Sequence, residues 1–242
     1  MPLPAPARRI VSLVPSLTET VASVDAALLV GATDWCVEPP GLDVVRVRGT
    51  KNPDVPRIVQ LRPDVVLANE EENRAADVAA LRDAGVPVWV TDVRTVPDAL
   101  AALGRMLAAC GLPIPPWLQE SAAVWAAPRR LDPARRVVVP IWRRPWMALG
   151  RDTFAGDVLA RLGALNVLAD AAVRYPRIDL AALPSYDLVV LPDEPYRFTA
   201  GDGPEAFPGK PCALVSGRHL TWYGPSLVEA PSVLLDQLAA AG

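Results

Sequence analysis

An internal repeat limits the fold of this chain more than any other feature of its sequence. Three short segments of the first half recur in the second half, in the same order and at a nearly constant separation. The paired segments are residues 8–11 and 135–139, residues 61–67 and 183–191, and residues 85–90 and 209–215. One Asp-Val-Val-Leu run is common in α/β chains, but three matches in the same order indicate duplication. We therefore expect two halves of similar structure.

Short apolar runs alternate with helical patterns in each half, which is typical of parallel sheets covered by helices. The predicted strands lie near residues 9–13, 28–32, 64–68 and 87–91, and near 136–141, 187–191 and 212–215. The predicted helices cover residues 17–25, 72–84, 153–163 and 225–240. Ser16 and Glu19 match a capping box at the start of the first helix. Gly85 supplies the left-handed conformation that ends the second helix.

Two further helices are predicted between the halves, over residues 97–110 and 117–130, on either side of a proline-rich break. The chain is therefore divided into an N-terminal α/β lobe (1–96), a connecting helical segment (97–131) and a C-terminal α/β lobe (132–242). A helical connection is stiffer than a flexible Gly/Ser linker, so we expect only small opening and closing movements.

Composition excludes several classes of protein. The chain has 242 residues, of which 51% are hydrophobic and 21% are charged, so it is not a disordered polymer. Its net charge of −3 argues against a nucleic-acid-binding protein, which normally has a basic excess. The chain has three cysteines, Cys36, Cys110 and Cys212. Their number is odd, and no two of them have C-x-x-C spacing. We therefore predict unpaired thiols, and neither a zinc site nor a disulfide framework.

The N-terminal residues bear on the location of the protein. Residues 1–9 lack the apolar stretch of a signal peptide, because Arg8 and Arg9 interrupt it. No charge-free stretch approaches the ~20 apolar residues that cross a bilayer, so no membrane insertion is expected. We predict a cytoplasmic location. The alternative is the periplasm or the extracellular space, if a leader has been removed.

Aromatic and polar residues follow several predicted strands, where the ligands of open parallel sheets bind. Of seven tryptophans, Trp35, Trp142 and Trp146 lie at these strand ends. The Arg-Arg-Pro segment between the last two predicts that both lie outside the core. Such rings would hold a flat or macrocyclic ligand, with Arg143 and Arg218 pairing with carboxylate or phosphate groups at its edge. The candidate ligand-binding residues are Ser16, Trp35, Asn73, Arg74, Trp142, Arg143, Trp146, Tyr175, Tyr196, Arg218 and His219.

Several aromatic and charged residues have a simpler structural interpretation. Trp117 and Trp125 lie on the predicted connecting helix and are expected to be structural, and Trp89 is expected in the core. The acidic run 70–72 is typical of a solvated helix start. His219 is the only histidine, so a metal site built from protein ligands is not predicted. A hydrogen-bonding role is favoured for it, although one histidine would suffice as the axial ligand of a bound macrocycle.

The sequence predicts no catalytic residues. It contains no G-x-S-x-G motif, no glycine-rich phosphate loop and no H-E-x-x-H motif. A Ser-His-acid triad would have to use His219, and no serine occupies a recognisable nucleophile elbow. The enzymatic alternative is a chelatase-like metal inserter in which His219 and Glu194 handle metal and protons.

Segments along nearly the whole chain resemble one known family. They are residues 9–19, 30–36, 49–53, 58–66, 85–88, 150–154, 163–167 and 175–176. The chain resembles the helical-backbone (class III) periplasmic binding proteins, which include the cobalamin- and ferric-siderophore-binding components of ABC importers. The Thr-Asp-Trp-Cys segment at 33–36 and the tryptophans at the strand ends make it most similar to the cobalamin-binding branch.

This resemblance implies an α/β fold of two Rossmann-like lobes with parallel sheets, joined by a connecting backbone helix as in chelatases. It implies non-enzymatic binding of a corrinoid or a related metal chelate in the interlobe cleft. No cofactor is required, and bound cobalamin or a ferric chelate would be the ligand. Importers of this family carry a glutamate on each lobe that docks with the membrane permease, and those positions fall at Pro56 and Ala181 here.

The loss of both glutamates favours a binding protein that is not coupled to a transporter. One alternative is the substrate-binding subunit of an ABC importer for cobalamin or a ferric siderophore. The other is the chelatase-like enzyme.

Overall fold

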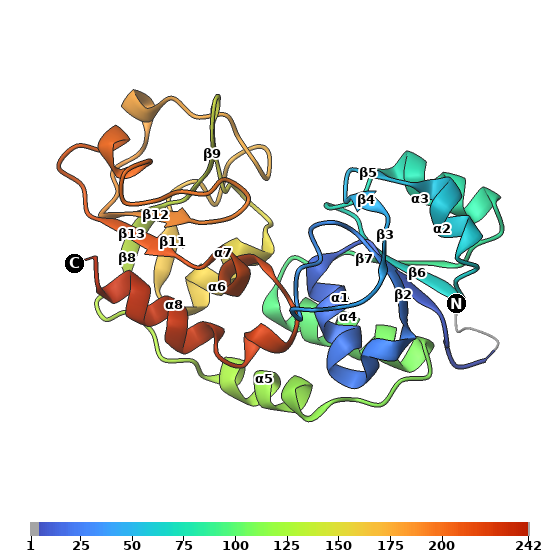
Figure 1. Cartoon of the computed structure of the whole chain (residues 1–242). Helices are drawn as coiled ribbons and strands as arrows, with labels where there is room; N and C mark the ends of the chain where they lie inside the picture. The colour runs from blue at the N-terminus through green and yellow to red at the C-terminus, as the bar shows by residue number, and fades with distance from the viewer. Residues whose placement is uncertain (1–4, 242) are drawn as a thin grey trace. The chain divides into compact units, whose positions relative to one another are not determined.

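The chain folds into two compact units. A computed structural model describes residues 5–241. Unit 1 comprises the described residues up to Asp92, together with Ala99–Glu120 and Tyr223–Pro225. Unit 2 comprises Val93–Asp98, Ser121–Trp222 and the described residues from Ser226 onward (Figure 1). Each unit is therefore built from segments that are distant in sequence.

Unit 1 contains a five-stranded parallel sheet in the order β3-β2-β1-β6-β7. Its strands are β1 (Ile10–Ser12), β2 (Leu29–Ala32), β3 (Val45–Arg46), β6 (Val65–Asn69) and β7 (Val88–Thr91), and β4 (Arg48–Gly49) pairs separately with β5 (Asn52–Pro53). The helices are α1 (Pro15–Asp25), α2 (Val55–Gln60), α3 (Ala75–Asp83) and α4 (Val96–Ala109), and α5 (Pro116–Ala126) crosses into unit 2. A short 3-10 turn, Ala26–Leu28, precedes β2.

Buried aliphatic side chains hold this sheet against its helices. Val11 and Val66, on β1 and β6, pack with Ile58 of α2 and Leu81 of α3. The runs of β-branched residues form strands because their side chains fill a surface that is covered on both faces. Gly85 and Gly111 follow α3 and α4 with φ of 78° and 70°, so the helix ends lie where left-handed backbone is available.

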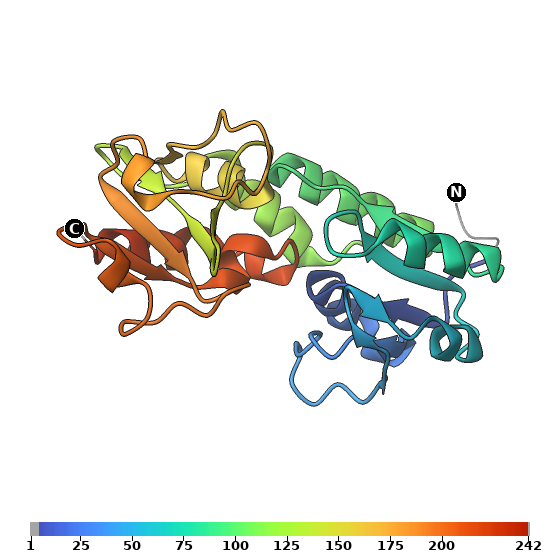
Figure 2. The same ribbon diagram turned by 90° about the horizontal axis from the view of Figure 1, so that it is seen from above.

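Unit 2 contains a four-stranded parallel sheet in the order β11-β8-β12-β13. Its strands are β8 (Arg135–Val138), β11 (Ala164–Asn166), β12 (Leu188–Pro192) and β13 (Cys212–Val215), and β9 (Pro140–Arg143) pairs antiparallel with β10 (Trp146–Ala148). The helices are α6 (Phe154–Arg161), α7 (Gly217–Thr221) and α8 (Ala230–Ala239), with 3-10 turns at Leu180–Ala182, Pro204–Ala206 and Pro225–Leu227. Helix α8 lies against β13 (Figure 2). The predicted α/β class with two parallel sheets is confirmed.

Four local predictions were wrong. The capping box does not form, because α1 begins at Pro15, whose fixed φ starts a helix without a side-chain cap. The strand predicted over 136–141 is divided at Val139 into β8 and β9. The helix predicted over 117–130 ends at Ala126, shortly before Pro128. The helix predicted over 225–240 begins only at Ala230, after a separate 3-10 turn.

The sequence repeat corresponds to the same contact in both units. In unit 1 the Asp64 carboxylate accepts hydrogen bonds from the backbone N–H groups of Arg8 and Arg9 at 2.7 and 2.8 Å. In unit 2 the Asp187 carboxylate accepts one from the Arg136 N–H at 2.8 Å. Each aspartate also donates its own N–H to the carbonyl of Arg9 or Arg136. It therefore fixes the start of β6 or β12 beside β1 or β8.

The part of the chain from residue 5 to residue 241 includes no helix with the length and apolar character needed to span a membrane.

We expect Asp64→Ala and Asp187→Ala to lower the free energy of unfolding by a similar amount, about 1 kcal/mol each. Each change leaves backbone N–H groups at a strand start without their charged acceptor. Chemical denaturation followed by circular dichroism measures the effect, and Asp43→Ala in the loop before β3 is the control. If only one of the two substitutions lowered the free energy of unfolding, the two aspartates would not be equivalent.

Candidate functional site

A buried polar cluster lies at the carboxyl ends of β6 and β7 in unit 1. The Tyr223 hydroxyl accepts a hydrogen bond from the Asn69 amide at 2.8 Å and lies 3.0 Å from the Thr91 hydroxyl. Tyr223 is only 6% exposed, and burial raises the pKa of its hydroxyl well above the usual value. The side chain therefore stays neutral and serves as a hydrogen-bonding anchor. The sequence analysis did not identify Tyr223, because it lies far along the chain from both partners.

Two predicted ligand-binding residues, Ser16 and Asn73, lie beneath the surface near this cluster. They are 2% and 4% exposed. The Asn73 side chain accepts a hydrogen bond from the Asn69 N–H and donates one to the Thr50 carbonyl, both at 2.9 Å. A side chain at Gly224 would come within 3.1 Å of the Ser16 carbonyl, so the chain passes closely here. Direct ligand contact by Ser16 or Asn73 stays a prediction.

Trp35 is presented to solvent from a fixed loop after β2. Its side chain is 67% exposed, although the neighbouring Cys36 is fully buried. The Arg46 guanidinium donates hydrogen bonds of 2.8 Å to the carbonyls of Thr33 and Cys36, which closes the loop. Burial raises the pKa of the Cys36 thiol, so this side chain is inert packing. All three cysteines are free, as predicted.

Arg74 is exposed at the start of α3. Its guanidinium pairs with the Asp77 carboxylate of the same helix at 2.8 Å. The hydrogen bond to Asp77 raises the pKa of Arg74, so the guanidinium stays charged. Trp35 and Arg74 therefore lie on different elements, and no contact that the structure describes joins them.

Unit 2 brings four predicted site residues together. Trp142, on β9, is 43% exposed and rests edge-on against the Tyr196 ring, with centroids 5.7 Å apart. Trp146, on β10, stacks on Phe198 at 6.0 Å, and the Arg143 guanidinium lies 5.4 Å from its ring centroid. The expectation that Trp142 lies outside the core is confirmed. Trp146 is half-buried against the core, because the hairpin folds its ring onto aromatic residues that the sequence pattern did not connect.

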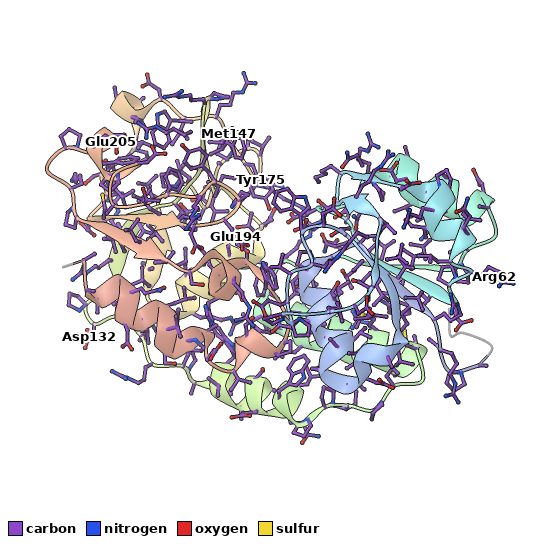
Figure 3. All side chains as sticks on the ribbon, viewed as in Figure 1. Arg62, Asp132, Met147, Tyr175, Glu194 and Glu205 are labelled. Carbon is purple, nitrogen blue, oxygen red and sulfur yellow. The ribbon has the colours of Figure 1, made fainter. Side chains whose placement is uncertain are left out.

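Arg143 is held by acidic residues of its own unit. It forms ion pairs with Asp202 and Glu205, and the Tyr196 hydroxyl donates to Asp202 at 2.6 Å. A hydrogen bond from the Gly203 N–H, with help from Arg143, lowers the pKa of Glu205. The Glu205 carboxylate is therefore charged at neutral pH, and the guanidinium fixes the hairpin. Glu205 and Met147 of β10 are labelled in Figure 3.

Tyr175 lies in the segment that pairs with the β9–β10 hairpin. Met147 forms an isolated antiparallel bridge with Arg177, and the Gly150 N–H donates to the Arg174 carbonyl at 2.7 Å (Figure 3). A side chain at Gly150 would come within 2.3 Å of the Val173 carbonyl. Position 150 therefore requires glycine, because the segment around Val173 passes too close for a side chain. Tyr175, in the same segment, is half-buried.

A second cluster follows β13, where Arg218 and His219 lie in the short helix α7. His219 Nδ1 lies 2.8 Å from the Ser216 hydroxyl, and Nε2 lies 3.0 Å from Glu229. Arg218 lies 3.6 Å from the same carboxylate and 5.8 Å from the Trp222 ring centroid. Both ring nitrogens of His219 thus have partners, which confirms its hydrogen-bonding role. Within residues 5–241, no group of three or more His, Cys, Asp or Glu side chains is arranged to hold a metal ion.

Ser216, His219 and Glu229 form a serine–histidine–carboxylate chain that the sequence analysis did not anticipate. A hydrolase also needs donors for a developing oxyanion, usually backbone N–H groups beside the nucleophile. Here the Ser216 N–H donates to Gln237 at 3.0 Å and the Gly217 N–H donates to Asp193 at 2.6 Å. Both of these N–H groups therefore already have side-chain acceptors. The Ser216 side chain at the start of this chain of hydrogen bonds is the N-cap of α7.

Glu194 is separate from His219 in this network. Its carboxylate accepts a hydrogen bond of 3.0 Å from the Trp222 indole. Burial raises the pKa of Glu194, with the Asp193 charge adding to the shift. The metal-handling pair of the chelatase alternative is therefore not joined directly, since Glu194 pairs with Trp222 and His219 pairs with Glu229.

The remaining tryptophans divide between structural and surface positions. Trp125 is 2% exposed and donates to the Leu227 carbonyl at 2.8 Å, which confirms its structural role. Trp117 donates to Ser23 at 2.9 Å. Trp89 was predicted in the core, but it is half-buried because β7 is the edge strand of its sheet.

Comparison with known proteins shows what this arrangement is similar to. A vitamin B12-binding protein of Vibrio cholerae is 24% identical over 188 residues, covering 73% of this chain and 67% of that protein. The solved periplasmic vitamin B12-binding protein of Vibrio cholerae superposes with a TM-score of 0.75 at 20% identity, covering 98% of each chain. The chain has the fold of the class III periplasmic binding proteins.

A second solved structure agrees with this assignment of the fold. A periplasmic heme-binding protein in complex with two hemes superposes with a TM-score of 0.78 at 23% identity, covering 98% of this chain and 99% of that chain. No protein-family model matches the chain. The resemblance stated from the sequence is confirmed, and the relatives named here are binding proteins and not enzymes.

We expect Tyr223→Phe to lower the free energy of unfolding by about 1–2 kcal/mol, because Asn69 and Thr91 lose a buried partner. Thermal and denaturant unfolding measure the loss, and Tyr186→Phe in unit 2 is the matched control. Equal stability of Tyr223→Phe and the parent chain would show that the hydroxyl does not anchor the cluster.

Glu194→Gln tests the charge at the Trp222 indole. Because the folded pKa of Glu194 is raised, the charged form opposes folding at neutral pH, and stability is gained as the pH falls through the folded pKa. Glutamine keeps an acceptor for Trp222 without the buried charge, so we expect the variant to be the more stable at neutral pH. The difference should shrink below 4.5, the ordinary pKa of this side chain. Denaturation midpoints of the variant and the parent chain, measured from neutral pH to below pH 4.5, give this difference in stability. A difference that does not change with pH would contradict the raised pKa of Glu194.

Proposed function

We propose that this protein binds a corrinoid or a related metal chelate without transforming it. The observation that supports this most directly is the exposure of large indole rings on fixed supports, Trp35 in unit 1 and Trp142 in unit 2. Flat metal complexes bind by stacking on such rings. The relatives, which bind vitamin B12 or heme according to their names, support the same ligand class.

The charges around Trp142 favour a corrinoid over a chelate with a carboxylate edge. Arg143 is already paired with two carboxylates, Asp202 and Glu205. Its charge is therefore not available to an anionic ligand edge, whereas the neutral amides at the edge of a corrinoid do not need it. Arg143 then acts by fixing the hairpin that presents Trp142, in place of the pairing with a ligand edge expected from the sequence.

The location and the partner of the protein are further parts of this proposal. The relatives are periplasmic, which supports the periplasm over the predicted cytoplasmic location. Pro56 on α2 and Ala181 in a 3-10 turn occupy the expected permease-docking positions. The nearest acidic residues, Asp54 and Asp179, are N-caps that accept backbone hydrogen bonds at 3.1 and 3.0 Å. We therefore propose a binding role that is independent of such docking.

Titration of cobalamin, heme and a ferric siderophore, by calorimetry and by absorbance, tests the ligand class. We expect the tightest binding for cobalamin. Trp35→Ala and Trp142→Ala should each weaken it about tenfold, or about 1.4 kcal/mol, because each removes one stacking surface.

The control is Trp117→Ala, which removes an indole that is hydrogen-bonded to Ser23. The Trp117→Ala variant should bind cobalamin with the same affinity as the parent chain. Absence of binding to all three chelates below millimolar concentration would overturn the proposed ligand class. A preference for heme over cobalamin would overturn the charge argument alone.

A further inference from the structure

Four arginines lie close together in the sequence just before and at the start of the sheet in unit 2. Arg129 and Arg130 follow helix α5, and Arg135 and Arg136 begin strand β8 (Figure 1). Three of these side chains are exposed, and that of Arg135 is half-buried. Within residues 5–241, no carboxylate forms an ion pair with any of the four guanidinium groups. We call this segment, residues 129–136, the arginine surface.

The internal repeat provides a comparison for Arg136. Its equivalent in unit 1 is Arg9, and the N–H of each donates to the aspartate before the neighbouring strand. The Arg9 guanidinium also has a structural role, because it donates to the Leu61 carbonyl at 2.6 Å. The Arg136 side chain forms no hydrogen bond with the described part of the chain. Unit 2 therefore has an arginine at this position without the contact that its side chain makes in unit 1.

The backbone that carries these arginines is fixed against the end of α6. The Leu131 N–H donates to the Leu162 carbonyl at 2.8 Å, and the Arg135 N–H donates to the Gly163 carbonyl at 2.9 Å. A side chain at Gly163 would come within 2.9 Å of the Leu131 carbonyl, so the two segments pass closely. Binding of a partner would therefore restrict only the arginine side chains, which limits its entropic cost.

An exposed apolar side chain lies beside the arginines. Leu165 is 46% exposed on the edge strand β11, and it is paired in register with Arg136 of β8. Residues paired across neighbouring strands direct their side chains to the same face of the sheet. The leucine and the guanidinium therefore form one amphipathic surface. Such a surface fits the interface of a bilayer, where phosphate groups lie above an apolar layer.

We propose that the arginine surface binds the protein peripherally to a membrane that contains anionic phospholipids. Guanidinium groups match phosphate oxygens with two parallel hydrogen bonds, so arginine is well suited to lipid headgroups. Two carboxylates lie in the same region, Asp132 within the segment and Asp187 at the Arg136 N–H. The four arginines outnumber them, so the surface is locally positive although the chain has a net charge of −3. That net charge disfavours an extended polyanion such as nucleic acid.

The arginine surface lies at the amino ends of the parallel strands of unit 2. Arg135 and Arg136 begin β8, whereas Glu194 follows the carboxyl end of β12. Figure 3 shows Asp132 of the arginine surface well away from Glu194. Trp142, on β9, lies beyond the carboxyl end of β8. Membrane contact through the amino ends therefore leaves the exposed Trp142 ring of this unit accessible to a ligand.

Sedimentation of the whole chain with phospholipid vesicles tests the proposal. Each arginine near an anionic surface contributes about a fivefold gain in affinity, so we expect a dissociation constant on the order of millimolar in accessible lipid. The vesicles contain equal parts of phosphatidylglycerol and phosphatidylcholine. Binding should be lost at about 1 M salt, where the screening length is only about 3 Å. Equal binding to vesicles of phosphatidylcholine alone overturns the proposal.

Substitutions of single arginines locate the binding surface. Arg136→Gln should weaken vesicle binding about fivefold, and Arg129→Gln with Arg130→Gln should weaken it about 25-fold. The matched control is Arg197→Gln, because Arg197 is an exposed arginine beyond the carboxyl end of β12 in the same unit. The Arg197→Gln variant should bind vesicles as the parent chain does. Equal weakening by Arg197→Gln and Arg136→Gln would show a response to net charge alone, and the proposal would be wrong.

Leu165→Asn separates a bilayer from other anionic partners. We expect it to weaken vesicle binding severalfold, because a bilayer offers an apolar layer and a soluble phosphate compound does not. Vesicle binding that is unchanged by Leu165→Asn and is abolished by micromolar inositol hexakisphosphate would identify a soluble phosphate compound as the partner. Tighter binding to duplex DNA or to a polyglutamate peptide, at the same ionic strength, would likewise overturn the membrane assignment. Cobalamin binding is measured separately, and its presence or absence does not bear on vesicle binding.

Discussion

One aspartate in each unit fixes the register on which the rest of that unit depends. Asp64 and Asp187 bind the backbone at the start of the neighbouring strand, and thereby set β6 beside β1 and β12 beside β8. In a parallel sheet, the register decides which side chains emerge together at the carboxyl ends. The polar cluster around Asn69 in unit 1 and the acidic pair Asp193 and Glu194 after β12 in unit 2 emerge at these ends as a result.

Most of the framework could be predicted from the sequence because its signals are local. The apolar run after Asp64 recurs after Asp187, and glycines at 85 and 111 mark helix ends by conformation alone. Residue types at strand ends also selected Trp35 and Trp142 as candidates, and both side chains are exposed. These signals need no knowledge of contacts between distant residues.

The contacts that the sequence did not predict are those between distant segments. Nothing local connects Tyr223 with Asn69, and the partners of Arg143 lie beyond three further strands. Strand β8 and the start of β9 were predicted as one strand over residues 136–141, because Val139 is as apolar as the residues around it. Arg143 was consequently assigned to a ligand, since a sequence shows a charge but not the carboxylates that fold back to meet it.

The supports of the exposed indoles bear on the affinity expected from the proposed function. A mobile side chain loses rotational freedom when a ligand fixes it, at about 0.5–1.5 kcal/mol for a flexible one. Trp35 lies in a loop closed by Arg46, next to the buried Cys36. Trp142 rests against Tyr196, whose hydroxyl donates to Asp202. Much of this ordering is therefore complete before binding. Under the proposed function, the polar contacts around the rings contribute to affinity by ordering the indoles, and their loss should weaken binding even where both indoles remain.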